Sequence, residues 1–265
     1  MVTSTKINAA DAPQLANALA EKAMVGEAVS EYEAPLPPNP SVILPGGYFD
    51  PVEGQITTAE VRELTGADEE AVSKLNDIGK SLLLILDRAT LKLGSITPEE
   101  GMLDALLSGD REMILLKIRM MTFGSDVSFT SKCPSCGESQ SWEIDLVDDV
   151  PIRKLKGSAQ FTLQCKAGTV EVSLPTGATQ KEIIYSTNKT SAEIDTIILR
   201  SCVKSINGMP VLGLETVRAL GLKDRRIILQ EISNRNPGPQ LGDIKKACNA
   251  CGTEVPLPLT LAELF

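Results

Sequence analysis

Histidine is missing from the 265-residue chain, and aromatic side chains make up only 3% of it. Without histidine, the commonest general base and the usual partner that activates a nucleophile are both unavailable. Few aromatic rings leave little surface on which nucleic-acid bases could stack. We therefore expect a protein that is not an enzyme, with no catalytic residues.

An excess of basic residues is also lacking, because 26 lysines and arginines face 35 acidic residues and give a net charge of −9. A surface that neutralises phosphates needs clustered positive charge, so nucleic acid is not the expected partner. The most apolar uninterrupted run, Leu82 to Leu86, is far shorter than the roughly 20 residues of a membrane helix. The N-terminus shows no basic region followed by an apolar one. These patterns predict a soluble protein, made in the cytoplasm and not inserted in a membrane.

Six cysteines are present, and four of them form two C-x-x-C-G knuckles. The two-residue gap lets both sulfurs of a knuckle reach one ion, and the glycine leaves backbone amides free to point at sulfur. Two knuckles together supply the four ligands of a closed tetrahedral site. We predict one structural Zn²⁺ per chain, held by Cys133, Cys136, Cys248 and Cys251.

The two knuckles are far apart in the chain, because residues 137 to 247, 111 in all, lie between Cys136 and Cys248. A simple ribbon has roughly 15 to 20 residues there, so a subdomain is expected between its halves. Thioredoxin-like redox chemistry is an alternative, but that fold places its cysteine pair at a helix N-terminus. Two separate metal sites and free thiols are further alternatives. Cys165 and Cys202 lie in apolar patterns and are predicted to be small buried hydrophobic residues.

The succession of helical and alternating patterns predicts an α+β fold. Its N-terminal part is expected to be helical, followed by a four-cysteine zinc ribbon that an inserted subdomain interrupts. The predicted regions are an extended or disordered arm at 1–45, a mainly helical domain at 46–124, the zinc ribbon at 125–150 with 245–265, and an inserted α+β subdomain at 151–244.

Helix start signals divide the helical region. Thr97 is predicted to cap a helix that runs to about Leu107, because Pro98 and Glu100 follow it as in a capping box. Asp110 is expected to cap the next helix, which is apolar on nearly all sides and should be buried. Later helices are expected at 180–188, 191–206 and 214–234, the last broken near Gly221.

Period-two alternation flanks the first knuckle and predicts a hairpin with two thiols at its tip. Trp142 on that hairpin is expected to anchor the ribbon's core. A second strand pair is expected at FTLQC and TVEVSL, around residue 166.

Several segments together carry a family resemblance. They are LPGGYFDPVEGQ, VRELTGADEE, a helix that ends in KIRMMTFG, CPSCG with SWEIDL, and CNACG with a terminal phenylalanine. The chain resembles, over about residues 41 to 265, the zinc-ribbon baseplate proteins of T-even-type contractile-tailed phages and related phage-tail-like particles. The resemblance implies a baseplate hub component or hub-assembly factor in the virion tail. The only site residues that the resemblance implies for this chain are the four cysteines.

The sequence leaves four functional hypotheses. The first is a structural baseplate protein that contacts other tail, hub or tape-measure proteins. The second is a tail-assembly chaperone that leaves the finished particle, the third a zinc-ribbon nucleic-acid adaptor, and the fourth an enzyme. The structural hypothesis includes an apolar C-terminal tail that docks onto neighbours, formed by Leu257, Leu259, Leu261, Leu264 and Phe265.

Overall fold

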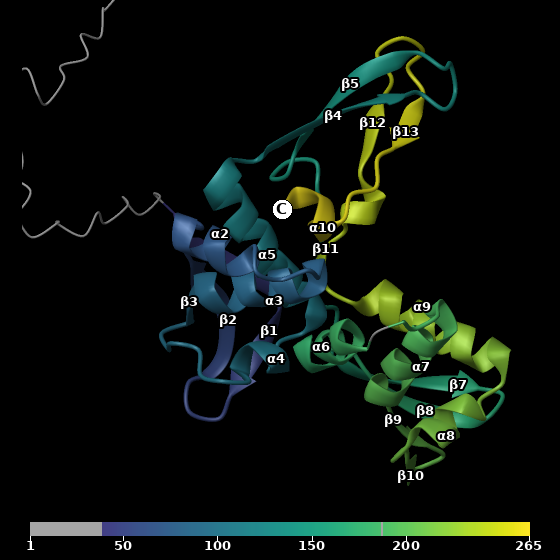
Figure 1. The fold of residues 1–265 in the computed structure, drawn as a ribbon. Coiled ribbons are helices and arrows are strands. Elements are labelled where there is room, and N and C mark those ends of the chain that lie inside the picture. The colour runs from purple at the N-terminus through teal and green to yellow at the C-terminus, as the bar shows by residue number, and fades with distance from the viewer. Residues whose placement is uncertain (1–38, 187) are drawn as a thin grey trace, which may run out of the picture. The chain divides into compact units, whose positions relative to one another are not determined.

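A three-stranded antiparallel sheet and four helices form the first part of the computed structural model, which describes residues 39–186 and 188–265 (Figure 1). The strand order is β1-β2-β3. Asp50 shapes the turn between the first two strands, since its carboxylate accepts hydrogen bonds from the backbone N–H groups of Val52 and Glu53. The elements are β1 Ser41–Asp50, β2 Gly54–Val61, α2 Gly66–Val72, α3 Ile78–Ala89, β3 Thr90–Leu93, α4 Met102–Ala105 and α5 Ser108–Phe123.

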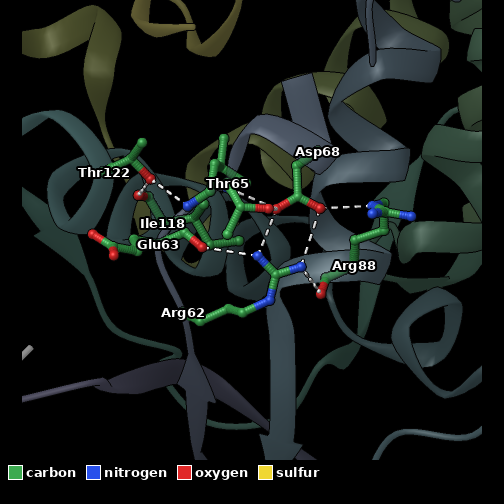
Figure 2. Close-up of polar contacts among 8 residues, drawn as sticks. Arg62, Glu63, Thr65, Asp68, Arg88, Ile118 and Thr122 are labelled. Atoms are coloured by element: carbon green, nitrogen blue, oxygen red, sulfur yellow. Dashed lines mark hydrogen bonds and ion pairs between the residues drawn. The ribbon is translucent and has the colours of Figure 1, made fainter. Parts of the chain in front are cut away.

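A buried carboxylate joins the end of β2 to α2 and α3. Thr65 is the N-cap of α2 and forms a capping box with Asp68, whose side chain is only 1% exposed. The guanidinium groups of Arg62 and Arg88 approach that carboxylate at 2.6 and 2.7 Å (Figure 2). Thr122 of α5 adds a further tie by accepting a hydrogen bond from the backbone N–H of Leu64 (Figure 2). The two charge-assisted contacts of Asp68 and the neutral hydrogen bond to Thr122 together fix the direction in which the chain leaves the sheet.

Helix α5 contributes side chains to two hydrophobic cores. Ile114 and Ile118 belong to the first core, with the sheet, α3 and α4. Leu116 belongs to a second core, with the cysteine-bearing hairpins. The prediction that this helix is buried is confirmed.

Two short hairpins carry the knuckles. The first hairpin pairs seven residues of each strand in register, from Asp126 with Asp145 to Lys132 with Ser139. Trp142 is 3% exposed, and its indole N–H donates to the Ser131 hydroxyl at 2.8 Å, which confirms its place in the core. The strands are β4 Asp126–Lys132 and β5 Ser139–Asp145 in the first hairpin, and β12 Lys245–Ala247 and β13 Glu254–Pro256 in the second.

The region between the hairpins enters and leaves through a paired neck. Strands β6 (Ile152–Arg153) and β11 (Gly238–Pro239) are antiparallel neighbours. Beyond the neck, a four-stranded sheet of order β10-β9-β8-β7 and three helices bury a third core. Its elements are β7 Gln160–Cys165, β8 Gly168–Ser173, α7 Ser191–Cys202, β9 Val203–Ile206, β10 Met209–Pro210, α8 Leu214–Arg218 and α9 Leu222–Arg235. Helix α6 (Gly177–Tyr185) lies in the same stretch of sequence but also contacts α3, α4 and α5.

Helices and strands together make the chain α+β, as predicted, but three local predictions are wrong. Thr97 caps no helix, because Gly101 adopts a φ of +85° and only the single turn α4 follows it. Asp110 lies inside the first turn of α5, where its carboxylate accepts the backbone N–H of Gly46 at 2.7 Å. Residues 203–206 leave α7 and form β9, since Val203 pairs with Val172 in the sheet.

Two segments, residues 41–45 and the C-terminal tail, are placed differently from the prediction. Residues 41–45, assigned to the arm, form the start of β1, because Val42 and Leu44 are buried in the first core. The rest of the predicted arm falls outside the described residues, apart from residues 39 and 40. The C-terminal tail, which was expected to dock onto neighbours, packs on its own chain, with Leu261 and Phe265 against both the first and second cores. It ends in the short helix α10, Leu261–Leu264.

Among the described residues, no helix combines the length and apolarity needed to cross a bilayer.

Candidate metal centre

Each knuckle is a tight turn at the end of a two-stranded hairpin, and the two turns repeat the same hydrogen bonds. In the first, the backbone N–H of Cys133 donates to the carbonyl of Glu138, and that of Gly137 donates to the carbonyl of Cys133. In the second, Cys248 donates to Thr253 and Gly252 donates to Cys248, at the equivalent positions. The two C-x-x-C-G sequences therefore fold into matching loops.

Glycine is required at the fifth position of both loops. Gly137 and Gly252 have φ angles of +76° and +71°, in the left-handed region that side chains with a Cβ rarely adopt. This conformation reverses the chain after the second cysteine. It therefore lets the strand return beside its partner while both sulfurs stay on the same side.

The four predicted sulfurs come together, with all of them within 4.8 Å of one another. The sulfurs of Cys133 and Cys251 lie 3.9 Å apart, and those of Cys136 and Cys248 lie 3.7 Å apart. A tetrahedral metal with four thiolates at about 2.3 Å requires sulfur separations of about 3.8 Å. A disulfide would bring two sulfurs to about 2.05 Å, so all four cysteines are free thiols. The residues present therefore fit a four-coordinate metal ion.

The thiols of the cluster differ in pKa, because each is affected by its own hydrogen bonds and by the neighbouring sulfurs. The hydroxyl and backbone N–H of Thr253 lower the pKa of Cys251 to about 6. At Cys136, the backbone N–H of Glu138 lowers the pKa, but desolvation and the neighbouring sulfurs outweigh it and raise the pKa to about 12. Close thiols thus oppose one another's ionisation, and a bound cation would relieve that opposition.

Polar contacts that the sequence does not reveal link the two knuckles. The side-chain oxygen of Gln140, on β5, accepts the backbone N–H of Asn249 at 3.1 Å. The hydroxyls of Thr253 and Ser135 lie 3.4 Å apart across the same junction. Gln140 follows the first knuckle at ordinary strand spacing, so nothing in the sequence marks it as a contact to residues more than one hundred positions away. These bonds hold the knuckles in register around the sulfurs.

The two other cysteines lie outside the cluster. Cys202 is fully buried in the third core, and burial raises its pKa to about 12. Cys165 packs against the same core and is partly exposed. Their prediction as small hydrophobic residues is confirmed for Cys202, and for the packing of Cys165.

The comparisons with known proteins extend this description. The sequence matches the family described as T4 bacteriophage base plate protein over residues 54–211, more than half of the chain. That range contains the first knuckle and ends before the second. No curated protein and no solved structure matches the sequence. The matched residues show that the chain belongs to the T4 bacteriophage base plate protein family, and so to a multi-protein assembly of the phage tail.

Proposed function

We propose that this protein is a structural component of the baseplate hub of a contractile tail, acting through contacts with other proteins. The family match over residues 54–211 is the observation that carries the proposal. The protein would be made and assembled in the host cytoplasm and would remain in the finished virion. Its partners would be other tail, hub or tape-measure proteins.

In this proposal, Cys133, Cys136, Cys248 and Cys251 hold one zinc ion, which makes the two hairpins a zinc ribbon. Four thiolates complete a tetrahedral coordination sphere and leave no position for a substrate or water. The ion would then contribute folding free energy and not catalysis. We accordingly assign the chain no enzymatic activity.

Mass spectrometry of purified particles tests the structural role. We expect the chain at a constant ratio to other baseplate proteins in particles that have been washed at high salt. The comparison is the lysate from which the particles were purified. A chain abundant in the lysate but missing from the particles would overturn the proposal in favour of an assembly chaperone.

A further inference from the structure

A groove with apolar walls lies where α3, α5, α6 and α10 meet, away from the cysteines. It encloses about 190 Å³. Helices α3 and α5 contact each other, and each of them contacts both α6 and α10, so the groove is part of their packing. Its walls are the partly or largely buried side chains of Leu82, Leu83, Leu115, Ile183, Ile184 and Leu261.

One carboxylate, that of Glu112, faces this apolar groove from α5. Its only hydrogen bond among the described residues comes from the Gln180 side-chain amide, at 3.3 Å. No lysine or arginine of the described residues forms an ion pair with it. Loss of hydration raises its pKa to about 7. Glu112 is partly buried, so its carboxylate faces the groove with one weak hydrogen bond and no ion-pair partner among the described residues.

The arginine that lines the groove and the lysine that follows Gln180 are bound to other groups. Arg111, which also lines the groove, donates to the carbonyl of Leu103 at 2.7 Å and to Asp104 at 3.0 Å. Lys181, one residue after Gln180, donates to the other oxygen of Asp104 at 2.7 Å. Asp104 therefore holds both cations, and neither of them pairs with Glu112.

We propose that this groove is a docking site for a lysine side chain of a partner protein. The inference rests on the proposed function only in taking that partner from the same tail assembly. Lysine combines an unbranched aliphatic stem, which suits the leucine and isoleucine walls, with an ammonium group for Glu112. The groove is smaller than the roughly 300–1,000 Å³ of small-molecule sites, so it has room for a single side chain.

A titration with two small probes tests the site in the full-length protein. The probes are N-acetyl-lysine N-methylamide and its neutral counterpart N-acetyl-norleucine N-methylamide, added at pH 8.5, where Glu112 is ionised. NMR signals of the Leu83 and Ile184 methyl groups report binding. We expect saturable shifts with the lysine probe, and binding at least about tenfold weaker with norleucine, as for the loss of a charged hydrogen-bonded partner.

Single substitutions distinguish lysine binding in the groove from attraction to other acidic residues on the surface. Glu112→Gln keeps the side-chain shape and should weaken lysine binding at least about tenfold, whereas Glu143→Gln, on exposed β5, should leave it unchanged. Leu83→Ala should weaken binding of both probes, because it shortens one wall. Denaturation curves of all three variants verify that each is folded. Equal binding of the two probes, or lysine binding that survives Glu112→Gln, would overturn the site. Particle composition does not enter this result, so it stands or falls separately from the structural role.

Discussion

At the scale of single residues, Asp68 makes more bonds than its place in the sequence suggests. An acid in the first turn of a helix is expected to complement the helix dipole, and α2 bears that out. The structure adds two arginines and a threonine to the same carboxylate. Its bond with Arg62, with help from Thr65 and Arg88, holds the pKa of Asp68 well below its ordinary value of 3.8.

Asp68→Asn should lower the free energy of unfolding at pH 7 by about 2–3 kcal/mol, because it leaves two arginines without their shared anion. The magnitude is at the low end for buried pairs, since Arg62 and Arg88 are 26% and 39% exposed. Urea denaturation measures the change. Glu70→Gln on the exposed side of α2 is the matched control and should change little.

Urea denaturation of wild type and Asp68→Asn at several pH values gives a second test of the ion pairs. A carboxyl whose pKa is lowered by folding stabilises the protein above its unfolded pKa of about 3.8, and this stability is lost as pH falls below that value. The difference between wild type and Asp68→Asn should therefore shrink from pH 5 to pH 2. A difference that stays constant over this range would show that the ion pairs are not its source.

At the scale of elements, the neck of the inserted region depends on two glycines. Gly109 in the first turn of α5 touches the backbone at Pro237 and Gly238, just before and within β11. A Cβ at Gly109 would lie 1.6 Å from the carbonyl oxygen of Pro237, and Gly238 itself has a φ of +117°. The helix and the returning strand can therefore cross only where both side chains are missing.

Gly109→Ala should destabilise the protein by about 3 kcal/mol, because backbone and not a flexible side chain occupies the space. Gly66→Ala is the control: it lies in α2 with nothing within 4 Å of its Cβ, and should stabilise by about 0.5–1 kcal/mol. Thermal and urea denaturation compare the two variants. Similar stabilities for both would mean that α5 and β11 do not cross closely.

The elements best predicted from sequence are those specified by a pattern within one short segment, such as alternating apolar residues or a turn glycine. The knuckle hairpin follows from period-two alternation around CPSCG, and the break before α9 falls at Gly221 as expected. The helix expected from Thr97 fails because Gly101 takes a left-handed conformation, for which its lack of a Cβ was the available signal. The end of α7 at Cys202 was not predicted. The signal in the sequence was Asn207-Gly208, which has positive φ at both residues and forms the two-residue turn that joins β9 to β10.

What sequence reasoning could not supply at the candidate sites is contact between distant segments. The four cysteines are recognisable because each knuckle is a local motif, and their assembly is the expected one. Gln140 and Glu112 have no such motif, and only the packing of other elements makes them distinctive. Apart from the end of the arm, the predicted domain boundaries stay predictions, although the neck at β6 and β11 lies near the limits expected for the inserted region.

At the scale of the whole molecule, the C-terminal segment connects the cysteine cluster to the helical part. After β13, the backbone N–H groups of Leu257 and Leu259 donate to the carbonyls of Ile244 and Leu241. The chain then places Leu261 and Phe265 against both cores. Among the described strands, no ladder joins the two knuckle hairpins. Side-chain packing, the contacts made by Gln140 and Thr253, and the sulfur cluster hold them together.

Removal of metal should therefore loosen the tail as well as the knuckles. After treatment with a zinc chelator, amide hydrogen exchange should accelerate over residues 241–265 and in the first hairpin. Exchange in β8, inside the third core, serves as the internal control and should not change. A tail that keeps its protection without metal would show that packing alone holds it.

Metal analysis of the purified protein tests most directly whether the two distant knuckles form one structural zinc site. We expect one zinc per chain in the wild type and in Cys202→Ser, and loss of zinc with strong destabilisation in Cys248→Ser. In the native wild type, the four clustered thiols should resist titration until a chelator is added. Less than about one zinc per chain, with all six thiols freely titratable, would contradict it.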